Sequence, residues 1–355
     1  MRRVLTVAAA LFALNAGLGV AQAQTQTVRM AWCAKTLSSA VAPFALATKL
    51  GWFEKMGIKV EVVPLPGSTD CVKSVATKDM PFGLPSEEPI IIIRRQGVDI
   101  RYYYTAYQGN VYGIAVPAES PIKTAADLRG KKIGVTSMAS AGVIVARALA
   151  AEAGMNPDKD IQILVAGEGA QTAALLRTNQ IDALSQFDTQ YAMVENAGMK
   201  LRRFEDASIR KFPSNGFIAL AETLKEKRKE AVALAKGYAM GTLFAINNPE
   251  AGIRALWEVY PQTKPTGKDE ATALRDDIKT LEARAENWKL EPVGAKRWGD
   301  NVLANHQGYL DWLLKQGVIK EKANASEFLF NDLLDEINDF DQAKIIAEAK
   351  AYKAK

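Results

Sequence analysis

The stretch SPIKTAADLRGKKIGVTSMASAG, residues 120–142, holds the clearest strand-to-helix transition in this chain. Residues 133–135 are predicted as a short buried strand, and Gly142 opens an apolar run typical of a helix. Thr136, Ser137 and Ser140 lie between the two, where hydroxyl oxygens commonly cap a helix start. The N–H groups of a helix start also favour an anionic or electron-rich group. The stretch therefore predicts either an ordinary capped helix or one side of a ligand site.

Strand and helix patterns alternate on both sides of this stretch. Strands are expected at residues 27–32, 59–64, 80–84, 100–106, 112–117, 161–165 and 183–185, and helices at 42–56, 69–77, 89–96, 142–153 and 170–178. Such alternation is typical of α/β proteins in which helices cover parallel-rich sheets. The pattern occurs once before residue 117 and again after it, which predicts two lobes.

The last expected strand, residues 217–220, is followed almost entirely by helical patterns. A single strand cannot form its own sheet, so we expect this one to rejoin the first sheet. The first lobe is then discontinuous, made of residues 24–116 plus 216–355, and the second lobe is residues 117–215. Two crossings link the lobes, near residues 116–117 and 213–216. Ligands of open α/β sheets bind beyond the carboxyl ends of the strands, so a cleft between the lobes is expected.

The first residues have the composition of a secretory signal. Arg2 and Arg3 precede an apolar run over residues 4–14, and small residues end at Ala23. We expect a signal peptide over residues 1–23 and a periplasmic product. No cysteine stands near the expected cleavage site, so a lipid anchor is not expected. The chain's 48% hydrophobic and 24% charged residues are typical of globular domains, and its net charge of +5 names no partner.

The chain contains two cysteines, Cys33 and Cys71. Each follows an expected strand in the first half of the chain, and an oxidising compartment favours a disulfide between them. A reactive Cys33 thiolate is the alternative, and it would need a base or a cation close by.

Four segments of the chain resemble the periplasmic substrate-binding proteins of ABC importers, in the nitrate, sulfonate and taurine group with the related thiamine-pyrimidine binders. They are residues 44–89 (FALATKLGWFEKMG…), 119–155 (ESPIKTAADLRGKKIGV…), 171–192 (QTAALLRTNQIDALSQFDTQYA) and 215–252 (NGFIALAETLKEK…). The resemblance implies a bilobed type II periplasmic binding protein with a helical C-terminal region. It implies a protein that captures a small solute and delivers it to a permease with its ATPase, as a monomer and without a cofactor.

The resemblance also places the ligand contacts on loops that follow strands. In the first lobe these are Lys35, Thr36, Ser38, Ser39, Ser68, Thr69, Ser86 and Glu87. In the second lobe they are Thr136, Ser137, Ser140, Phe187 and Asp188, and Asn215 stands at a crossing, where it either touches ligand or shapes the hinge. Many relatives carry Trp-Glu-Pro where this chain has Gln-Phe-Asp at residues 186–188.

The charges among these residues are mixed. Lys35 suits an anion, whereas Glu87 and Asp188 repel one unless they face ligand donors. Nitrate is therefore less suitable than an organic solute such as a sulfonate, a carboxylate or an aromatic or heterocyclic compound. Trp32, Tyr107 and Tyr112 are expected either to stack on such a ligand or to pack in the core.

An enzyme of the same fold is the competing hypothesis, since relatives include a desulfinase and a pyrimidine synthase that use cysteine. Cys33 is the corresponding candidate, but the chain's single histidine, His306, lies far along the helical tail. No metal-ligand spacing or phosphate loop occurs. The densest charge run, residues 225–230, alternates in sign, which does not favour nucleic acid. We therefore predict a binding protein, not an enzyme.

Overall fold

The computed structural model describes residues 25–204 and 209–353 of the 355-residue chain. The signal peptide expected at residues 1–23 lies outside the described residues. Within the described ranges, no helix combines the length and the apolar character needed to cross a membrane.

The first sheet has the strand order β2-β1-β3-β10-β4. Its strands are β1 (Gln26–Trp32), β2 (Ile58–Pro64), β3 (Phe82–Gly83), β4 (Ile100–Thr105) and β10 (Gly216–Leu220). β1 pairs in parallel with β2 and β3, whereas β10 runs antiparallel to β3 and β4. The late strand therefore rejoins the first sheet, as the sequence predicts.

The second sheet has the strand order β7-β6-β8-β5-β9. Its strands are β5 (Ala115–Pro117), β6 (Lys132–Val135), β7 (Gln162–Val165), β8 (Ala183–Leu184) and β9 (Leu201–Arg203). β6 pairs in parallel with β7 and β8, and β5 runs antiparallel to β8 and β9. Both sheets are thus mixed, and the predicted α/β architecture with two sheets is confirmed.

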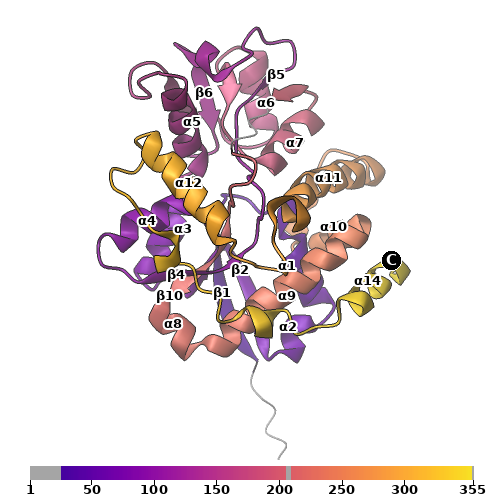
Figure 1. The fold of residues 1–355 in the computed structure, drawn as a ribbon. Coiled ribbons are helices and arrows are strands. Elements are labelled where there is room, and N and C mark those ends of the chain that lie inside the picture. Colours follow the sequence, from indigo (N-terminus) through magenta and orange to yellow (C-terminus); the bar gives the residue numbers. More distant parts are fainter. Residues whose placement is uncertain (1–24, 205–208, 354–355) are drawn as a thin grey trace, which may run out of the picture.

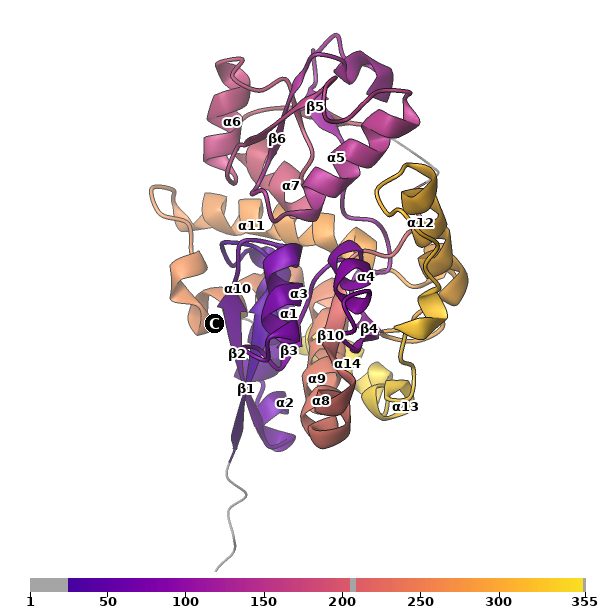
Figure 2. The ribbon, with the colours of Figure 1, turned by 90° about the vertical axis from the view of Figure 1, so that its left-hand side faces the viewer.

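Helices cover both sheets, and the two sheets lie at opposite ends of the molecule with α11 between them (Figures 1 and 2). The α-helices are α1 (Ala42–Lys49), α2 (Trp52–Lys55), α3 (Ser68–Ala76), α4 (Glu88–Arg94), α5 (Ala141–Glu152), α6 (Ala170–Arg177), α7 (Asp188–Asn196), α8 (Ala221–Glu226), α9 (Arg228–Asn247), α10 (Pro249–Val259), α11 (Glu270–Ala285), α12 (Leu303–Lys315), α13 (Leu334–Ile337) and α14 (Gln342–Ala351). Short 3-10 helices lie at Ser39–Val41, Ala125–Leu128, Pro261–Thr263, Glu286–Trp288, Glu291–Val293 and Ala325–Glu327.

One expected helix, residues 42–56, is instead two. α1 ends at Lys49 and α2 begins at Trp52, because Gly51 between them has a left-handed backbone with φ of 68°. Glycine adopts this conformation without the steric cost that a Cβ brings, so the chain turns here. One α-helix and one strand were not predicted at all: α7 directly after Phe187, and the edge strand β9.

The first sheet is packed against α1 and α9 through aromatic side chains. Phe44 of α1 meets Phe217 of β10 edge to face at 6.1 Å between ring centroids, and Tyr238 of α9 meets both rings. All three side chains are fully buried. Burial of each ring contributes roughly 2–3 kcal/mol of hydrophobic stabilisation, so this layer fixes the sheet from which the site is built.

Two chain segments run between the sheets, one after β4 and one before β10 (Figure 1). They are hydrogen-bonded to each other: Tyr107 N–H donates to the carbonyl of Asn215 at 2.9 Å, and Ser214 N–H donates to that of Tyr107 at 3.0 Å. β5 already pairs within the second sheet from Ala115 onward. The exact lobe boundaries, 24–116 plus 216–355 and 117–215, stay a prediction.

Candidate functional site

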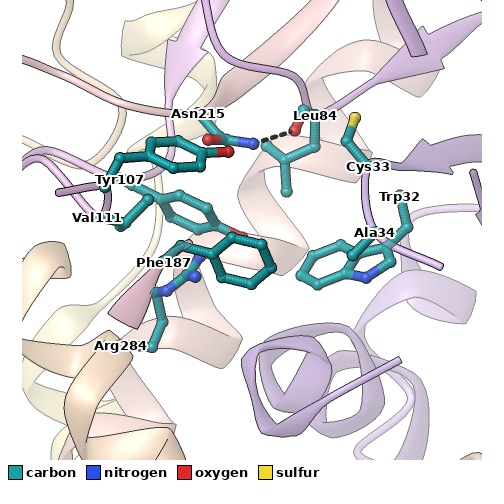
Figure 3. A pocket seen from close by; sticks show the side chains of 10 residues that line it. Trp32, Cys33, Ala34, Leu84, Tyr107, Val111, Phe187, Asn215 and Arg284 are labelled. Carbon is teal, nitrogen blue, oxygen red and sulfur yellow. Dashed lines mark hydrogen bonds between the residues drawn. The ribbon is translucent and has the colours of Figure 1, made fainter. Parts of the chain in front are cut away.

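A cavity lies where the two crossing segments meet the ends of the strands (Figure 3). In this structure the cavity is narrow: about 20 Å³ of it is open to the centre of a water-sized sphere, which is room for about one water molecule. Its lining comes from the end of β1, from the loops that follow strands β1, β3 and β8, from the crossing segments and from the end of α11. The lining residues are Trp32, Cys33, Ala34, Leu84, Tyr107, Val111, Tyr112, Phe187, Asn215 and Arg284.

Four aromatic rings dominate this lining. Trp32 ends β1, Tyr107 and Tyr112 lie on the first crossing segment, and Phe187 follows β8. Tyr112 and Phe187 meet edge to face at 5.9 Å between ring centroids. The Trp32 indole N–H is already bonded to the carbonyl of Thr36 at 3.0 Å. The cavity therefore offers mainly ring faces and edges, which suit a flat apolar or aromatic group.

A buried ion pair stands at one side of the cavity. Arg284 of α11 donates from Nε to Asp188 Oδ2 at 2.9 Å and from Nη2 to Oδ1 at 2.6 Å. The Arg284 guanidinium also lies 3.8 Å from the centre of the Tyr107 ring. Burial alone lowers the pKa of Arg284, but the Asp188 carboxylate outweighs it and holds that pKa above its usual value. Burial raises the pKa of Tyr107 to about 12, although Arg284 opposes the shift.

Asn215 contributes a side-chain amide to the cavity lining. Its Nδ2 donates to the carbonyl of Leu84 at 2.8 Å, and its Oδ1 accepts from Ser214 Oγ at 3.2 Å. A carbonyl oxygen has two lone pairs, so Oδ1 can accept a second hydrogen bond from a ligand donor. Asn215 thus lies on a crossing segment and lines the cavity, and its role as a ligand contact or as a hinge residue stays a prediction.

The expected disulfide is present: Cys33 is bonded to Cys71 with the Cα atoms 5.8 Å apart. Cys33 directly follows β1 and Cys71 lies in α3, which follows the neighbouring strand β2. The bond therefore holds the wall of the cavity at Cys33 against α3.

The strand-to-helix junction at residues 133–142 makes contact with the first lobe. Ser137 Oγ donates to the carbonyl of Pro66 at 2.7 Å, and Thr69 N–H donates to the carbonyl of Ala139 at 3.3 Å. Ser140 caps α5 by accepting from the N–H of Gly142 at 3.1 Å. The predicted ligand contacts Thr136, Ser137 and Ser140 are buried but lie outside the cavity lining. In this structure the junction serves as a contact between lobes and as a helix cap.

The other predicted contacts of the first lobe lie outside the cavity lining. Lys35 and Thr36 are exposed, and Thr36 donates to Glu168 of the second lobe. Ser38 and Ser39 stand at the start of the Ser39–Val41 3-10 helix. Ser68 and Thr69 begin α3, and Ser68 Oγ accepts from the N–H of Ser86 at 3.1 Å. Of all the predicted contacts, Phe187 and Asn215 line the cavity.

Glu87 is buried in a polar cluster beneath the hinge. Its carboxylate pairs with Nδ1 of His306, which is also buried and lies 3.2 Å by Nε2 from Thr105 Oγ1. The neighbouring Glu88 accepts from Tyr309 Oη. Burial raises the pKa of both carboxyl groups. Glu87 therefore faces protein partners, and His306 is a packed residue of the core.

Sequence reasoning missed Arg284. This residue belongs to the buried face of α11, together with Ala273, Thr280 and Leu281. Positions 273, 280, 281 and 284 recur at helical spacing, so an arginine on that face is the signal that could have identified it. Its partner Asp188 was predicted as a ligand contact, and the structure places the carboxylate on Arg284 instead. The prediction for Asp188 as a direct contact remains untested.

Comparisons with known proteins agree with this architecture. Residues 38–252 match the model of the family described as NMT1/THI5 like. A protein of Bacillus subtilis (strain 168) named for binding aliphatic sulfonates is 28% identical over 145 residues, which is 39% of this chain and 44% of that protein. The riboflavin-binding protein RibY of Chloroflexus aurantiacus is 22% identical over 63% of this chain and 64% of its own length. The chain thus spans less than two thirds of each of these relatives.

Solved structures share the fold. The alkanesulfonate-binding protein SsuA from Xanthomonas axonopodis pv. citri, bound to MOPS, has a TM-score of 0.63 at 18% identity, covering 86% of this chain and 98% of that one. The desulfurization enzyme DSZB has a TM-score of 0.53 at 15% identity, covering 88% and 98%. The fold is therefore that of the periplasmic binding proteins. Because the family model matches more than half of its residues, this chain belongs to the NMT1/THI5-like family.

Proposed function

We propose that this protein is the periplasmic solute-binding component of an ABC importer, and that it captures a small organic solute with an aromatic part. The solute binds at the cavity between the lobes, which must move apart to admit it because the cavity is narrow in this structure. The solute is then delivered to a permease driven by its ATPase. The observation that carries this proposal is the convergence on one cavity of four aromatic rings from the end of β1, the first crossing segment and the loop after β8, which are Trp32, Tyr107, Tyr112 and Phe187.

The composition of the cavity favours an aromatic ligand over a small inorganic ion. Leu84 and Val111 add apolar surface to the four rings. Nitrate would make no apolar contact with these rings, and it would need several hydrogen-bond donors that the lining residues do not supply. Among the relatives, one is named for riboflavin, which has a fused ring system, and others for sulfonates. The names of these relatives refer to organic solutes, which supports an organic solute as the ligand of this protein.

A catalytic role for Cys33 is the competing function, since DSZB shares the fold. The sulfur of Cys33 is bonded to that of Cys71, and a disulfide sulfur is not the thiolate that nucleophilic catalysis uses. Within the described residues, no group of three His, Cys, Asp or Glu side chains is placed to hold a metal ion. The binding function is therefore better supported than the catalytic one.

A ligand screen followed by one substitution tests the proposal. Thermal unfolding of the mature protein is measured with planar aromatic amides and carboxylates, with alkanesulfonates, with taurine and with nitrate. A true ligand at about a hundredfold excess over its dissociation constant adds about 2.7 kcal/mol to stability. We expect the aromatic compounds to raise the melting temperature and nitrate to leave it unchanged.

Phe187→Ala is expected to weaken binding of the best aromatic ligand about tenfold or more, because a ring contact contributes about 0.5–1.5 kcal/mol beyond its buried area. Phe212→Leu is the matched control, since Phe212 packs on Tyr309 and Trp312 and not in the cavity. Isothermal titration calorimetry measures both. Equal affinities of the two variants, or stabilisation by aliphatic sulfonates alone, would contradict an aromatic site.

A further inference from the structure

We propose that Asp188 is a built-in counter-ion for Arg284, and that this pair makes the cavity select uncharged aromatic ligands over anionic ligands of the same shape. The inference rests on the proposed function, because it concerns the same cavity and names the charge class of its ligand.

The pair is fully removed from water and closely bonded. Arg284 is 2% exposed and Asp188 is 1% exposed. Both carboxylate oxygens receive guanidinium hydrogen bonds, from Nε at 2.9 Å to Oδ2 and from Nη2 at 2.6 Å to Oδ1. Oδ2 also accepts from Asn287 Nδ2 at 2.9 Å. In this side-on geometry the protein itself supplies the hydrogen bonds of the Asp188 carboxylate, and the carboxylate neutralises the charge of Arg284.

No other cation among the described lining residues is available to an anion. Arg284 is the one charged side chain in the lining. Lys35, the cation expected from the sequence, is exposed and outside the lining. Arg203 reaches the same region, but its Nη2 meets the main-chain oxygen of Asp188 at 3.4 Å and its guanidinium lies over Tyr191. An incoming carboxylate or sulfonate must therefore share Arg284 with Asp188.

Sharing is unfavourable because both anions would then lie in a low-dielectric site with one cation. If the ligand displaces Asp188, a buried carboxylate loses its ionic partner. An uncharged ligand meets no such opposition. It can use the ring faces and the acceptor Oδ1 of Asn215, and it leaves the hydrogen bonds between Arg284 and Asp188 in place. The geometry points to planar carboxamides and to neutral heterocycles that carry an N–H group.

A pair of isosteric probes tests this selection directly. Binding of 2-naphthamide and of 2-naphthoate to the mature protein is measured by titration calorimetry at pH 7.5, where only the second probe is charged. The wild type is expected to bind the amide at least about tenfold more tightly, which corresponds to about 1.4 kcal/mol. A wild type that prefers the naphthoate overturns the inference while leaving the aromatic site intact. Binding of neither probe contradicts the proposed function itself, and this inference with it.

Asp188→Asn tests the cause of the preference. It keeps the shape of the side chain and removes its charge, so the affinity for naphthoate is expected to rise about tenfold or more while that for naphthamide changes little. Glu286→Gln is the matched control: it makes the same charge change two residues from Arg284, on an exposed side chain paired with Lys289. The control is expected to keep the wild-type preference. An Asp188→Asn protein with the wild-type preference overturns the inference.

Circular dichroism shows whether Asp188→Asn folds. If it does not, a variant of the other partner in the ion pair is used. Arg284→Gln leaves Asp188 without its cation, so the affinity for 2-naphthylmethylammonium is expected to rise relative to wild type. If this variant folds and the affinity for the ammonium probe stays the same, Asp188 does not set the charge preference. If neither variant folds, the inference is accepted or rejected on whether the wild-type protein prefers 2-naphthamide to 2-naphthoate.

Discussion

Cys33 and Cys71 act at the residue scale, where one covalent bond fixes a wall of the cavity. The bond closes a loop of 38 residues between the end of β1 and α3. In the chain-entropy model, closing a loop of this length stabilises the folded state by about 3 to 4 kcal/mol. The double variant Cys33→Ser, Cys71→Ser is expected to lose about this much unfolding free energy, measured by urea denaturation.

The same bond also decides between binding and catalysis. Thiol titration of the denatured, unreduced wild-type protein is expected to find no free thiol. One reactive thiol at Cys33 in the folded protein would contradict the disulfide and would reopen the catalytic hypothesis. A double variant as stable as the wild type would contradict the expected stabilisation of the folded state by the disulfide.

At the scale of elements, α11 of the C-terminal region packs against the second lobe. It packs on α7 beside the Arg284 and Asp188 pair, and on α10 through Trp257, whose Nε1 donates to Asp277 Oδ2 at 2.8 Å. Burial raises the pKa of Asp277 to about 6. A carboxyl group whose pKa is higher in the folded state favours folding most at acid pH, and this contribution is lost as the pH rises through 6.

Asp277→Asn removes this pH dependence while keeping an acceptor for Trp257. We expect the variant to gain stability over the wild type between pH 4 and pH 7, by about 1 to 2 kcal/mol after allowing for partial exposure of the side chain. Urea unfolding at the two pH values measures the gain. Glu282→Gln, an exposed change on the same helix, is the control and should follow the wild-type pH profile. If the stability of Asp277→Asn changes with pH in the same way as that of the wild type, burial of Asp277 does not cause the pH dependence.

At the scale of the whole molecule, the two lobes meet at Gly67. Its backbone is extended, with φ of 173°, but a Cβ on this residue would lie 2.4 Å from the carbonyl oxygen of Ala139 in the second lobe. Gly67→Ala is therefore compatible with each lobe alone and incompatible with the closed contact. On the proposed function, a ligand held by both lobes stabilises the contact between them, so a substitution that hinders this contact is expected to weaken binding.

Solution scattering tests this expectation with saturating 2-naphthamide. The Gly67→Ala protein is expected to keep a larger radius of gyration than the saturated wild type and to bind about tenfold more weakly. Gly308→Ala is the control, because its Cβ would meet Phe212 at an ordinary 3.6 Å. Identical scattering curves for the Gly67→Ala and wild-type complexes would refute a role for this contact in closure.

The sequence anticipated the fold better than the site. Strand and helix periodicity is local, so β1, β2, β6, α3 and α5 appear close to their expected ranges. The helix expected over residues 42–56 was wrong, because the conformation of Gly51 interrupts it. The resemblance placed Phe187 on a loop that follows a strand and Asn215 at a crossing, whereas Arg284 comes from a helix about a hundred residues beyond Asp188 in the chain.

The amino-acid sequence by itself indicated the two mixed sheets and the return of β10 to the first sheet, because these depend on periodicity and on the lone late strand. It left two possibilities for the cysteines, a disulfide between Cys33 and Cys71 or a reactive Cys33, and the structure has the disulfide. Only the tertiary structure decided which side chains face one another. It assigned Ser137 to a contact between lobes, Glu87 to His306, and Asp188 to Arg284. Charge partners in a folded chain are set by packing between distant elements, and the pattern along one element does not specify them.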